Sequence, residues 1–214
     1  MTATARPSRT GPASSPGRVR RVSARPVRIV VLASGTGTTL QAILEATADP
    51  DDFGGQVAAA GTDVKGCAAM ERAEARGIPT FAVQLRDFAD RAAWNDALAE
   101  TIAGYQPDLV VLAGFMRILA PDVVRRFRIV NTHPALLPAF PGPQAVRDAL
   151  AARAARTGVT VHWVDEGIDT GPVIAQLEVP VMAGDDEAAL TARIQAAEKP
   201  FYVKAIHQLC QEIT

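Results

Sequence analysis

Short apolar strands alternate with helical segments along this sequence from Val27 onward. The stretch VRIVVLA is a continuous apolar run, typical of a strand that is buried on both faces of a parallel sheet. The stretch TTLQAILEATA follows, with apolar residues at helical spacing after a threonine. Because strands that alternate with helices build parallel βαβ units, the pattern predicts an α/β fold with a doubly wound sheet.

The rest of the chain continues this alternation. Further strands are predicted at 55–61, 78–83, 108–114 and 128–131, and helices at 66–76, 91–104, from 121 and at 145–155. Two strands near 158–164 and 173–181 then follow one another without a helix between them, before a closing helix from about 186. The expected sheet is therefore mostly parallel, with helices on both faces and an antiparallel edge.

Residues 1–26 differ in composition from the rest and are predicted to be a disordered extension rich in Arg, Pro and Ser, ahead of a single domain at 27–214. Residues 1–28 hold seven arginines and no acidic residue. Without those arginines the formal net charge of -1 becomes -8, so nucleic-acid binding is not expected. The prolines of the extension oppose the amphipathic helix of a transit peptide, and we interpret it as dispensable.

Composition restricts the setting in which the chain works. Its 214 residues are 48% hydrophobic, which fits one domain with a sizeable core. No apolar run is long enough to span a bilayer, so no membrane partner is expected. Cys67 and Cys210 lie far apart without the spacing of a metal site, which favours reduced thiols in a cytoplasmic protein.

Ligands of doubly wound sheets bind at the carboxyl ends of the strands, and the first strand ends in SGTGTTLQ. Glycines at a turn into a helix let the backbone approach a ligand, and free helix amides beside Thr38 and Thr39 could hold a phosphate. The stretch is neither a dinucleotide fingerprint, because Leu40 replaces the third glycine, nor a Walker loop, because it lacks the lysine. Gly35 and Gly37 could also serve the turn alone.

The fifth strand ends in NTHPALLPAFPG, where Asn131 and His133 share a face if the extended conformation continues. Pro134 favours that conformation at His133. A carboxylate partner is available in VDEGIDTGPVI, although Asp169 could merely bond its own turn. If Asp169 reaches His133, it stabilises the imidazolium as a proton donor, and Asn131 adds a neutral donor to an oxyanion. The set then predicts formyl or acyl transfer without a covalent nucleophile or a metal. The loop AGFMRIL, with Arg117, is either a packing loop or a groove for a flat heteroaromatic ring.

These residues resemble the family of phosphoribosylglycinamide formyltransferases, or glycinamide ribonucleotide transformylases, folate-dependent enzymes of purine synthesis. The resemblance extends from about 27 to 207 and rests on five stretches in the family's order and spacing: SGTGTTLQ, PDLVVLAGFMRIL, NTHPALLPAFPG, GIDTGPVI and GDDEAALTARIQAAE. It implies the formyltransferase fold and the transfer of a formyl group from 10-formyltetrahydrofolate to the amine of glycinamide ribonucleotide.

The resemblance also implies roles for individual residues. By it, the catalytic residues are Asn131, His133 and Asp169. Residues that bind phosphoribosylglycinamide are Gly37, Thr38 and Thr39 at the phosphate and Glu198 at the ribose. Residues that bind the folate are Arg91, Met116, Arg117, Ile118, Leu119 and Asn131. The implied partners are these two small molecules, with no metal, no nucleic acid and no membrane, and a homodimer is left open.

One departure from the family keeps alternatives open. The family has a histidine two residues after FPG, where this chain has Gln144, which cannot carry a proton near neutral pH. A catalytically impaired nucleotide-binding homologue is one alternative, and a formyltetrahydrofolate hydrolase, which normally carries an added N-terminal domain, is another. A methionyl-tRNA formyltransferase would need a further C-terminal domain and a basic surface. We interpret His162 and His207 as structural or surface residues.

Overall fold

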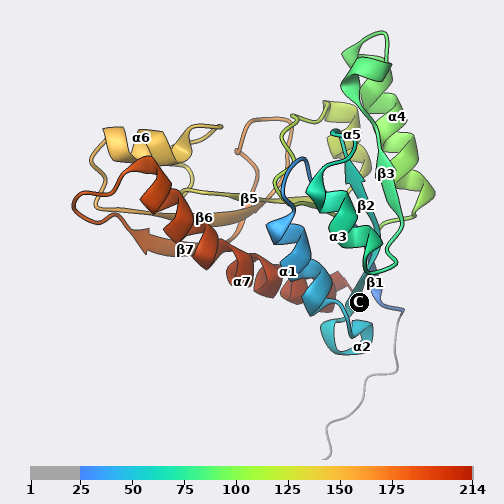
Figure 1. The fold of residues 1–214 in the computed structure, drawn as a ribbon, viewed down its shortest axis with the longest axis horizontal. Helices are drawn as coiled ribbons and strands as arrows, with labels where there is room; N and C mark the ends of the chain where they lie inside the picture. The colour runs from blue at the N-terminus through green and yellow to red at the C-terminus, as the bar shows by residue number, and fades with distance from the viewer. Residues whose placement is uncertain (1–24, 214) are drawn as a thin grey trace, which may run out of the picture.

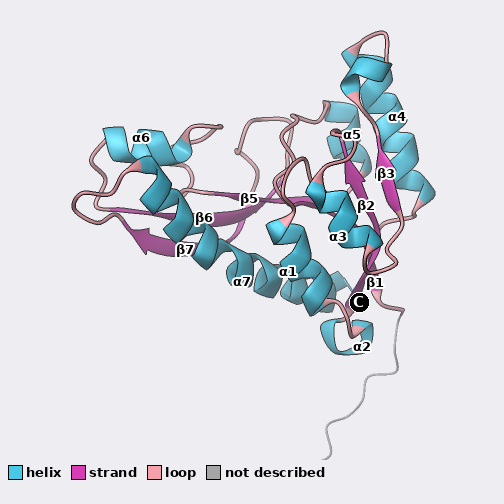
Figure 2. Ribbon diagram, in the orientation of Figure 1, coloured by secondary structure: helices cyan, strands magenta, loops and turns pink. Residues whose placement is uncertain are grey.

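A seven-stranded sheet forms the centre of the computed structural model, which describes residues 25–213. Its strands are β1 Val27–Leu32, β2 Gly55–Thr62, β3 Thr80–Ala82, β4 Leu109–Leu112, β5 Ile129–His133, β6 Arg156–Trp163 and β7 Val173–Pro180. In the order β3-β2-β1-β4-β5-β6-β7, β1 to β5 pair in parallel, and β6 pairs antiparallel with β5 and β7 (Figures 1 and 2). The predicted doubly wound, mostly parallel sheet with an antiparallel edge is confirmed.

Helices cover both faces of the parallel part. One face carries α1 Thr38–Ala46, α3 Ala68–Glu74 and α7 Glu187–Ile213, and the other carries α4 Arg91–Gly104 and α5 Pro121–Arg126. Shorter helices are α2 Pro50–Phe53, α6 Ala145–Ala151 and the 3-10 helix Leu85–Asp87. Alternate residues of β1 divide between the faces, with Ile29 in the first cluster and Val30 in the second. Burial on both faces explains why β1 is apolar from Ile29 to Leu32.

The closing helix α7 connects the antiparallel edge of the sheet with its parallel part. It packs against β6 and β7 near its start, through Leu190 and Ile194, and then continues over the parallel part (Figure 1). There the buried hydroxyl of Tyr202 donates hydrogen bonds to the carbonyl oxygens of Leu112 at 3.1 Å and Val130 at 2.9 Å. These bonds hold α7 against the last residue of β4 and the second residue of β5, close to the candidate site.

The predicted end of one helix differs from the structure. Helix α4 has the predicted bounds, whereas α6 ends at Ala151 instead of residue 155, because Arg153 takes a left-handed φ of 51° and β6 already begins at Arg156. The predicted extension, apart from Arg25 and Pro26, lies outside the described residues. Within residues 25–213, no helix combines the length and the apolar character that crossing a membrane requires.

Candidate active site

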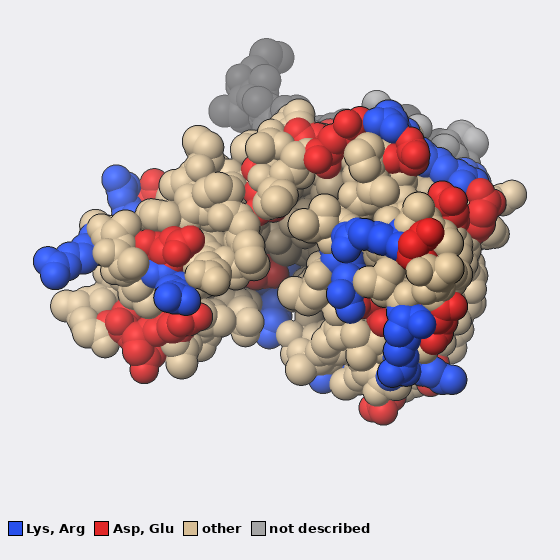
Figure 3. Space-filling model, turned by 90° about the horizontal axis from the view of Figure 1, so that it is seen from above, with Lys and Arg blue, Asp and Glu red and all other residues tan. Residues whose placement is uncertain are grey.

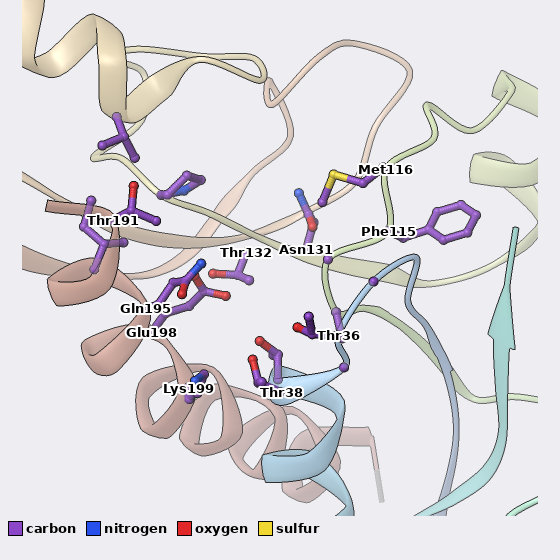
Figure 4. Close-up of a pocket in the computed structure, with 18 residues that line it drawn as sticks. Thr36, Thr38, Phe115, Met116, Asn131, Thr132, Thr191, Gln195, Glu198 and Lys199 are labelled. Atoms are coloured by element: carbon purple, nitrogen blue, oxygen red, sulfur yellow. The ribbon is translucent and has the colours of Figure 1, made fainter. Parts of the chain in front are cut away.

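A cavity of about 390 Å³ lies at the carboxyl ends of β1, β4 and β5. The chain order of the sheet reverses between β1 and β4, so the loops after these strands diverge and leave a crevice, as expected for ligand sites of this fold. One wall is formed by α7, through Thr191, Ile194, Gln195, Glu198 and Lys199 (Figure 4). Seen from above, the surface is hollowed between the part that carries α6 and the part that carries α4 and α5 (Figure 3).

The N-terminus of α1 faces this cavity. Gly37 precedes the helix with a φ of 69°, and a Cβ there would lie 2.5 Å from the Cα of Ala69. Backbone geometry and the contact with α3 therefore both require glycine. Because Gly37 has no side chain to cap the helix, the first-turn amides beside Thr38 and Thr39 are open to an anion. Thr36 and Thr38 bring their hydroxyl groups to the same side (Figure 4).

His133 and Asp169 are in contact, although they come from distant parts of the chain. His133 ends β5, and Asp169 lies in the loop between β6 and β7 with a φ of 55°. His133 Nδ1 is 3.2 Å from Asp169 Oδ2, and the two side chains are 5% and 13% exposed. The same carboxylate oxygen accepts a hydrogen bond from the Gly142 amide at 2.8 Å. The loop between the antiparallel strands β6 and β7 thus places the carboxylate of Asp169 next to His133.

The second ring nitrogen of His133 also faces an oxygen, because Nε2 lies 2.7 Å from the carbonyl oxygen of Phe140. Only the imidazolium form can donate to the carboxylate and to the carbonyl at once. Asn131, two residues earlier on β5, lines the cavity directly (Figure 4). The strand therefore presents one neutral and one ionisable donor on the same face, as predicted from the extended conformation.

His162 is a site neighbour that sequence reasoning missed. It lies opposite Asn131 in the β5–β6 ladder, with its Nε2 3.3 Å from Asn131 Nδ2 and 3.6 Å from Asp169 Oδ1. Burial lowers the pKa of its imidazole, while the hydrogen bond to the Trp163 carbonyl and the charge of Asp169 oppose that shift. The sequence interpretation of this histidine is structural or surface; its side chain is 2% exposed, which excludes the surface position and agrees with the structural one. No motif marks His162, because its place depends on the register between two strands.

Glu198 and Lys199 of α7 are the charged residues among the described residues that line the cavity. Burial raises the pKa of the Glu198 carboxyl group, and the positive charge of Lys199 partly offsets that shift. In Figure 4 both project from α7, and they line the same cavity as Thr38 at the start of α1. The cavity therefore has both an acceptor and a cation on its α7 wall.

The predicted folate residues gather on the segment Gly114–Leu119, between β4 and α5, and at the start of α4. Met116 and Ile118 are 74% and 61% exposed, whereas Leu119 is 7% exposed and packs in the core with α4 and α5. Arg91 donates a hydrogen bond to the carbonyl oxygen of Ile118 at 2.5 Å. Arg117 turns its side chain to Asp63, with 2.6 Å between Nε and Oδ2. The side chains of Arg91 and Arg117, both predicted to bind the folate, thus hold this segment in place.

The two remaining residues that the sequence singled out lie at the margins. Gln144 is exposed at the residue before α6, where its Oε1 is 3.5 Å from Arg147 Nη1. His207 Nδ1 lies 2.9 Å from the carbonyl oxygen of Phe53, a contact between α7 and α2. His207 therefore has a packing contact distant from the cavity, in agreement with a structural role.

Comparison with known proteins gives the family. Residues 27–206 match the model of the family described as formyl transferase. The phosphoribosylglycinamide formyltransferase of Mycobacterium tuberculosis H37Rv is 50% identical over 186 residues, which cover 86% of this chain and 85% of that protein. The protein of the same name from Escherichia coli K12 is 43% identical over 178 residues, covering 82% and 84%.

Solved structures agree with the sequence relatives. The crystal structure of glycinamide ribonucleotide transformylase 1 from Symbiobacterium toebii matches with a TM-score of 0.85 and 40% identity, over 92% of this chain and 94% of that chain. The phosphoribosylglycinamide formyltransferase of Streptococcus pneumoniae TIGR4 matches with a TM-score of 0.78 and 39% identity, over 86% and 98%. The present chain belongs to the formyl transferase family.

Proposed function

We propose that this protein transfers the formyl group of 10-formyltetrahydrofolate to the amine of glycinamide ribonucleotide, a step of purine biosynthesis. The relatives named above support the reaction class and the acceptor. The observation that carries the proposal is the contact between His133 and Asp169, 3.2 Å apart. His133 lies two residues along β5 from Asn131, which lines the cavity that opens to the uncapped amides of α1. A phosphorylated amine and a formyl donor can meet across this crevice, which supplies the proximity term of catalysis.

The acceptor occupies the cavity between α1 and α7. Its phosphate binds the amides at Gly37, Thr38 and Thr39, and the charge of Lys199 favours the same anion. Glu198 accepts hydrogen bonds from the ribose hydroxyls. This placement directs the amine of the acceptor toward Asn131, at the opposite wall.

The folate lies against the segment Gly114–Leu119, where exposed Met116 and Ile118 offer apolar contact and the main chain offers hydrogen bonds. Its formyl oxygen comes to His133 Nε2 and Asn131 Nδ2, taking the position at His133 that the Phe140 carbonyl oxygen has in this structure. Arg91, exposed at the start of α4, holds this segment through its hydrogen bond to the Ile118 carbonyl oxygen.

The amine nitrogen attacks the formyl carbon and a tetrahedral oxyanion forms. Asn131 and the imidazolium of His133 stabilise that charge, and one such donor typically lowers the barrier by about 3 kcal/mol. Asp169 orients the ring of His133 through its contact with Nδ1. The attacking amine loses a proton and the departing folate nitrogen gains one. Asp169, 13% exposed, can mediate that exchange through a water molecule.

The test is formyl transfer by the purified protein. The deformylation of 10-formyltetrahydrofolate is measured with and without glycinamide ribonucleotide, and the formylated nucleotide is detected by mass. We expect deformylation that depends on the nucleotide, and Asp169→Asn should lower kcat by about a hundredfold or more while the protein still folds. Glu166→Gln, in the same loop but on an exposed pair with Arg125, serves as the matched control and should keep kcat.

Other outcomes point elsewhere. Deformylation that proceeds equally without the nucleotide would indicate a hydrolase. Binding of both substrates without turnover would indicate a homologue that has lost its chemistry, with Gln144 as the first residue to restore to histidine. A folded Asp169→Asn protein with undiminished transfer would reject the role given to that carboxylate.

A further inference from the structure

The segment Gly114–Leu119 is held in place by a side chain from another strand end. Ser34 lies two residues after the end of β1 and contacts the segment twice. Its amide donates a hydrogen bond to the carbonyl oxygen of Gly114 at 3.1 Å, and its Oγ accepts one from the amide of Met116 at 2.9 Å. Gly114 has a φ of 76°, so the segment turns sharply at the first of these contacts. Ser34 therefore holds the start of the segment through the carbonyl group of Gly114 and the amide of Met116.

A buried carboxylate completes this arrangement. Asp63 directly follows β2, and its side chain is only 2% exposed. One oxygen, Oδ1, accepts the hydrogen bond of the Ser34 hydroxyl at 2.5 Å, and the other, Oδ2, accepts from Arg117 Nε at 2.6 Å. Met116 and Arg117 are neighbours in the chain, so the two bonds return to adjacent residues of one segment. The result is a closed ring of hydrogen bonds that joins the ends of β1, β2 and the segment after β4.

The position of this ring of hydrogen bonds indicates a role beyond packing. Burying a carboxylate costs free energy unless it is fully paired, and Asp63 uses both oxygens for residues that hold this one segment. The segment itself presents apolar side chains to solvent, because Met116 and Ile118 are largely exposed. Met116 also lines the cavity with Asn131 (Figure 4). A buried charge thus supports an exposed surface that borders the site.

We infer that Asp63 is a positioning residue for the folate: through Ser34 and Arg117 it holds the main chain at 116–118 in the conformation that receives the heteroaromatic ring. This inference rests on the proposed function. Arg117, predicted from the family resemblance as a folate contact, then contributes its main chain while its side chain serves as the link to Asp63. Arg91, bonded to the Ile118 carbonyl oxygen, holds the segment from the opposite side.

The inference is tested with Asp63→Asn and Ser34→Ala in the full-length protein. Asp63→Asn keeps the size of the side chain but removes its charge and one of its two acceptor oxygens, so it weakens the contact with Arg117 or with Ser34. We expect KM for 10-formyltetrahydrofolate to rise about tenfold in each variant, with KM for glycinamide ribonucleotide nearly unchanged. The matched control is Glu178→Gln. Glu178 lies on β7 and forms an exposed ion pair with Arg156, so its replacement should leave both KM values unchanged.

Two further measurements separate positioning from plain stability. A structural role would lower the melting temperature and the amount of active protein but leave the folate KM unchanged, and that result in both variants would overturn the inference. In a double-mutant cycle, Asp63→Asn and Arg117→Gln should together raise the folate KM no more than either alone, whereas additive effects would count against the link.

Failure of the proposed function can be distinguished from failure of the inference. If the wild-type protein does not transfer the formyl group, the proposed function fails and the variants are compared by equilibrium binding of 10-formyltetrahydrofolate. Weaker binding by Asp63→Asn and Ser34→Ala would still support the positioning role, and unchanged binding by both would reject it.

Discussion

At the scale of single residues, Glu198 shows how a charged group that lines the cavity can reduce stability. Burial raises the pKa of its carboxyl group, with Lys199 opposing the shift, so the folded protein holds a proton more tightly than the unfolded chain does. The resulting stabilisation is fully present below the unfolded pKa of the carboxyl group and is lost as pH rises through the folded pKa. Above the folded pKa, the buried carboxylate of Glu198 therefore weakens the free protein.

We expect the Glu198→Gln protein to melt a few degrees higher than the wild type at pH 7.5. The difference should disappear below about pH 4.5, where the side chain at this position is neutral in both proteins. The same change should raise KM for glycinamide ribonucleotide about tenfold, because an uncharged acceptor binds the ribose hydroxyls less strongly. Thermal unfolding across this pH range, together with steady-state kinetics, checks both effects. A lower melting temperature at pH 7.5 would contradict the argument.

The residues of the site were predictable to different degrees. Asn131 and His133 could be identified because a strand end followed by prolines is visible in the sequence. Ser34, Asp63 and His162 could not, since each acts through partners 29 to 82 residues away along the chain. Their importance depends on which strands are neighbours and in what register. Local patterns do not specify register, although they do specify the strands themselves.

At the scale of elements, the loop between β1 and α1 has two glycines with different tasks. A Cβ at Gly37 would lie 2.5 Å from the Ala69 Cα, and the residue has a φ of 69°, whereas a Cβ at Gly35 would meet nothing within 4 Å. The contact at Gly37 joins α1 to α3, so a larger residue would separate these helices. The sequence pattern could not tell the two glycines apart, because both fit a strand-to-helix turn.

Gly37→Ala should therefore destabilise the protein by roughly 1–3 kcal/mol, the usual cost of a strained backbone, before any effect of the clash is added. Gly35→Ala should leave the free energy of unfolding nearly unchanged, because the added methyl group has room. Urea denaturation of both variants measures the difference. Equal stability of the two would show that the loop adapts and that the contact with Ala69 is not rigid.

At the scale of the whole molecule, the candidate site needs both the parallel strands and the antiparallel edge of the sheet. The parallel strands β1, β4 and β5 open the crevice, but the loop with Asp169 reaches His133 only because β6 and β7 turn back beside β5. The late pair of strands was predicted from the absence of a helix between them. Its consequence for the site was not predictable, because it depends on the three-dimensional path of the β6–β7 loop.

The N-terminal boundary of this unit is a prediction that two truncations can test. In the described structure, Arg25 forms an exposed ion pair with Asp108 at 2.7 Å, and β1 begins at Val27, which is 2% exposed. A protein that starts at Arg25 should keep the wild-type kcat, KM and melting temperature, because all described elements remain.

A protein that starts at Ile29 gives the matched comparison. It loses the buried side chain of Val27, worth roughly 1.5–3 kcal/mol, and the hydrogen bond from the Val27 amide to the carbonyl oxygen of Gly54 at 2.9 Å. It also loses the bonds of Arg28 to the Tyr105 carbonyl oxygen and to Asp108. We expect a melting temperature lower by several degrees, measured by calorimetry on both truncations. If removal of residues 1–24 alone reduced stability or turnover, the extension would have to be counted as part of the domain, because every contact described at the start of β1 would still be present.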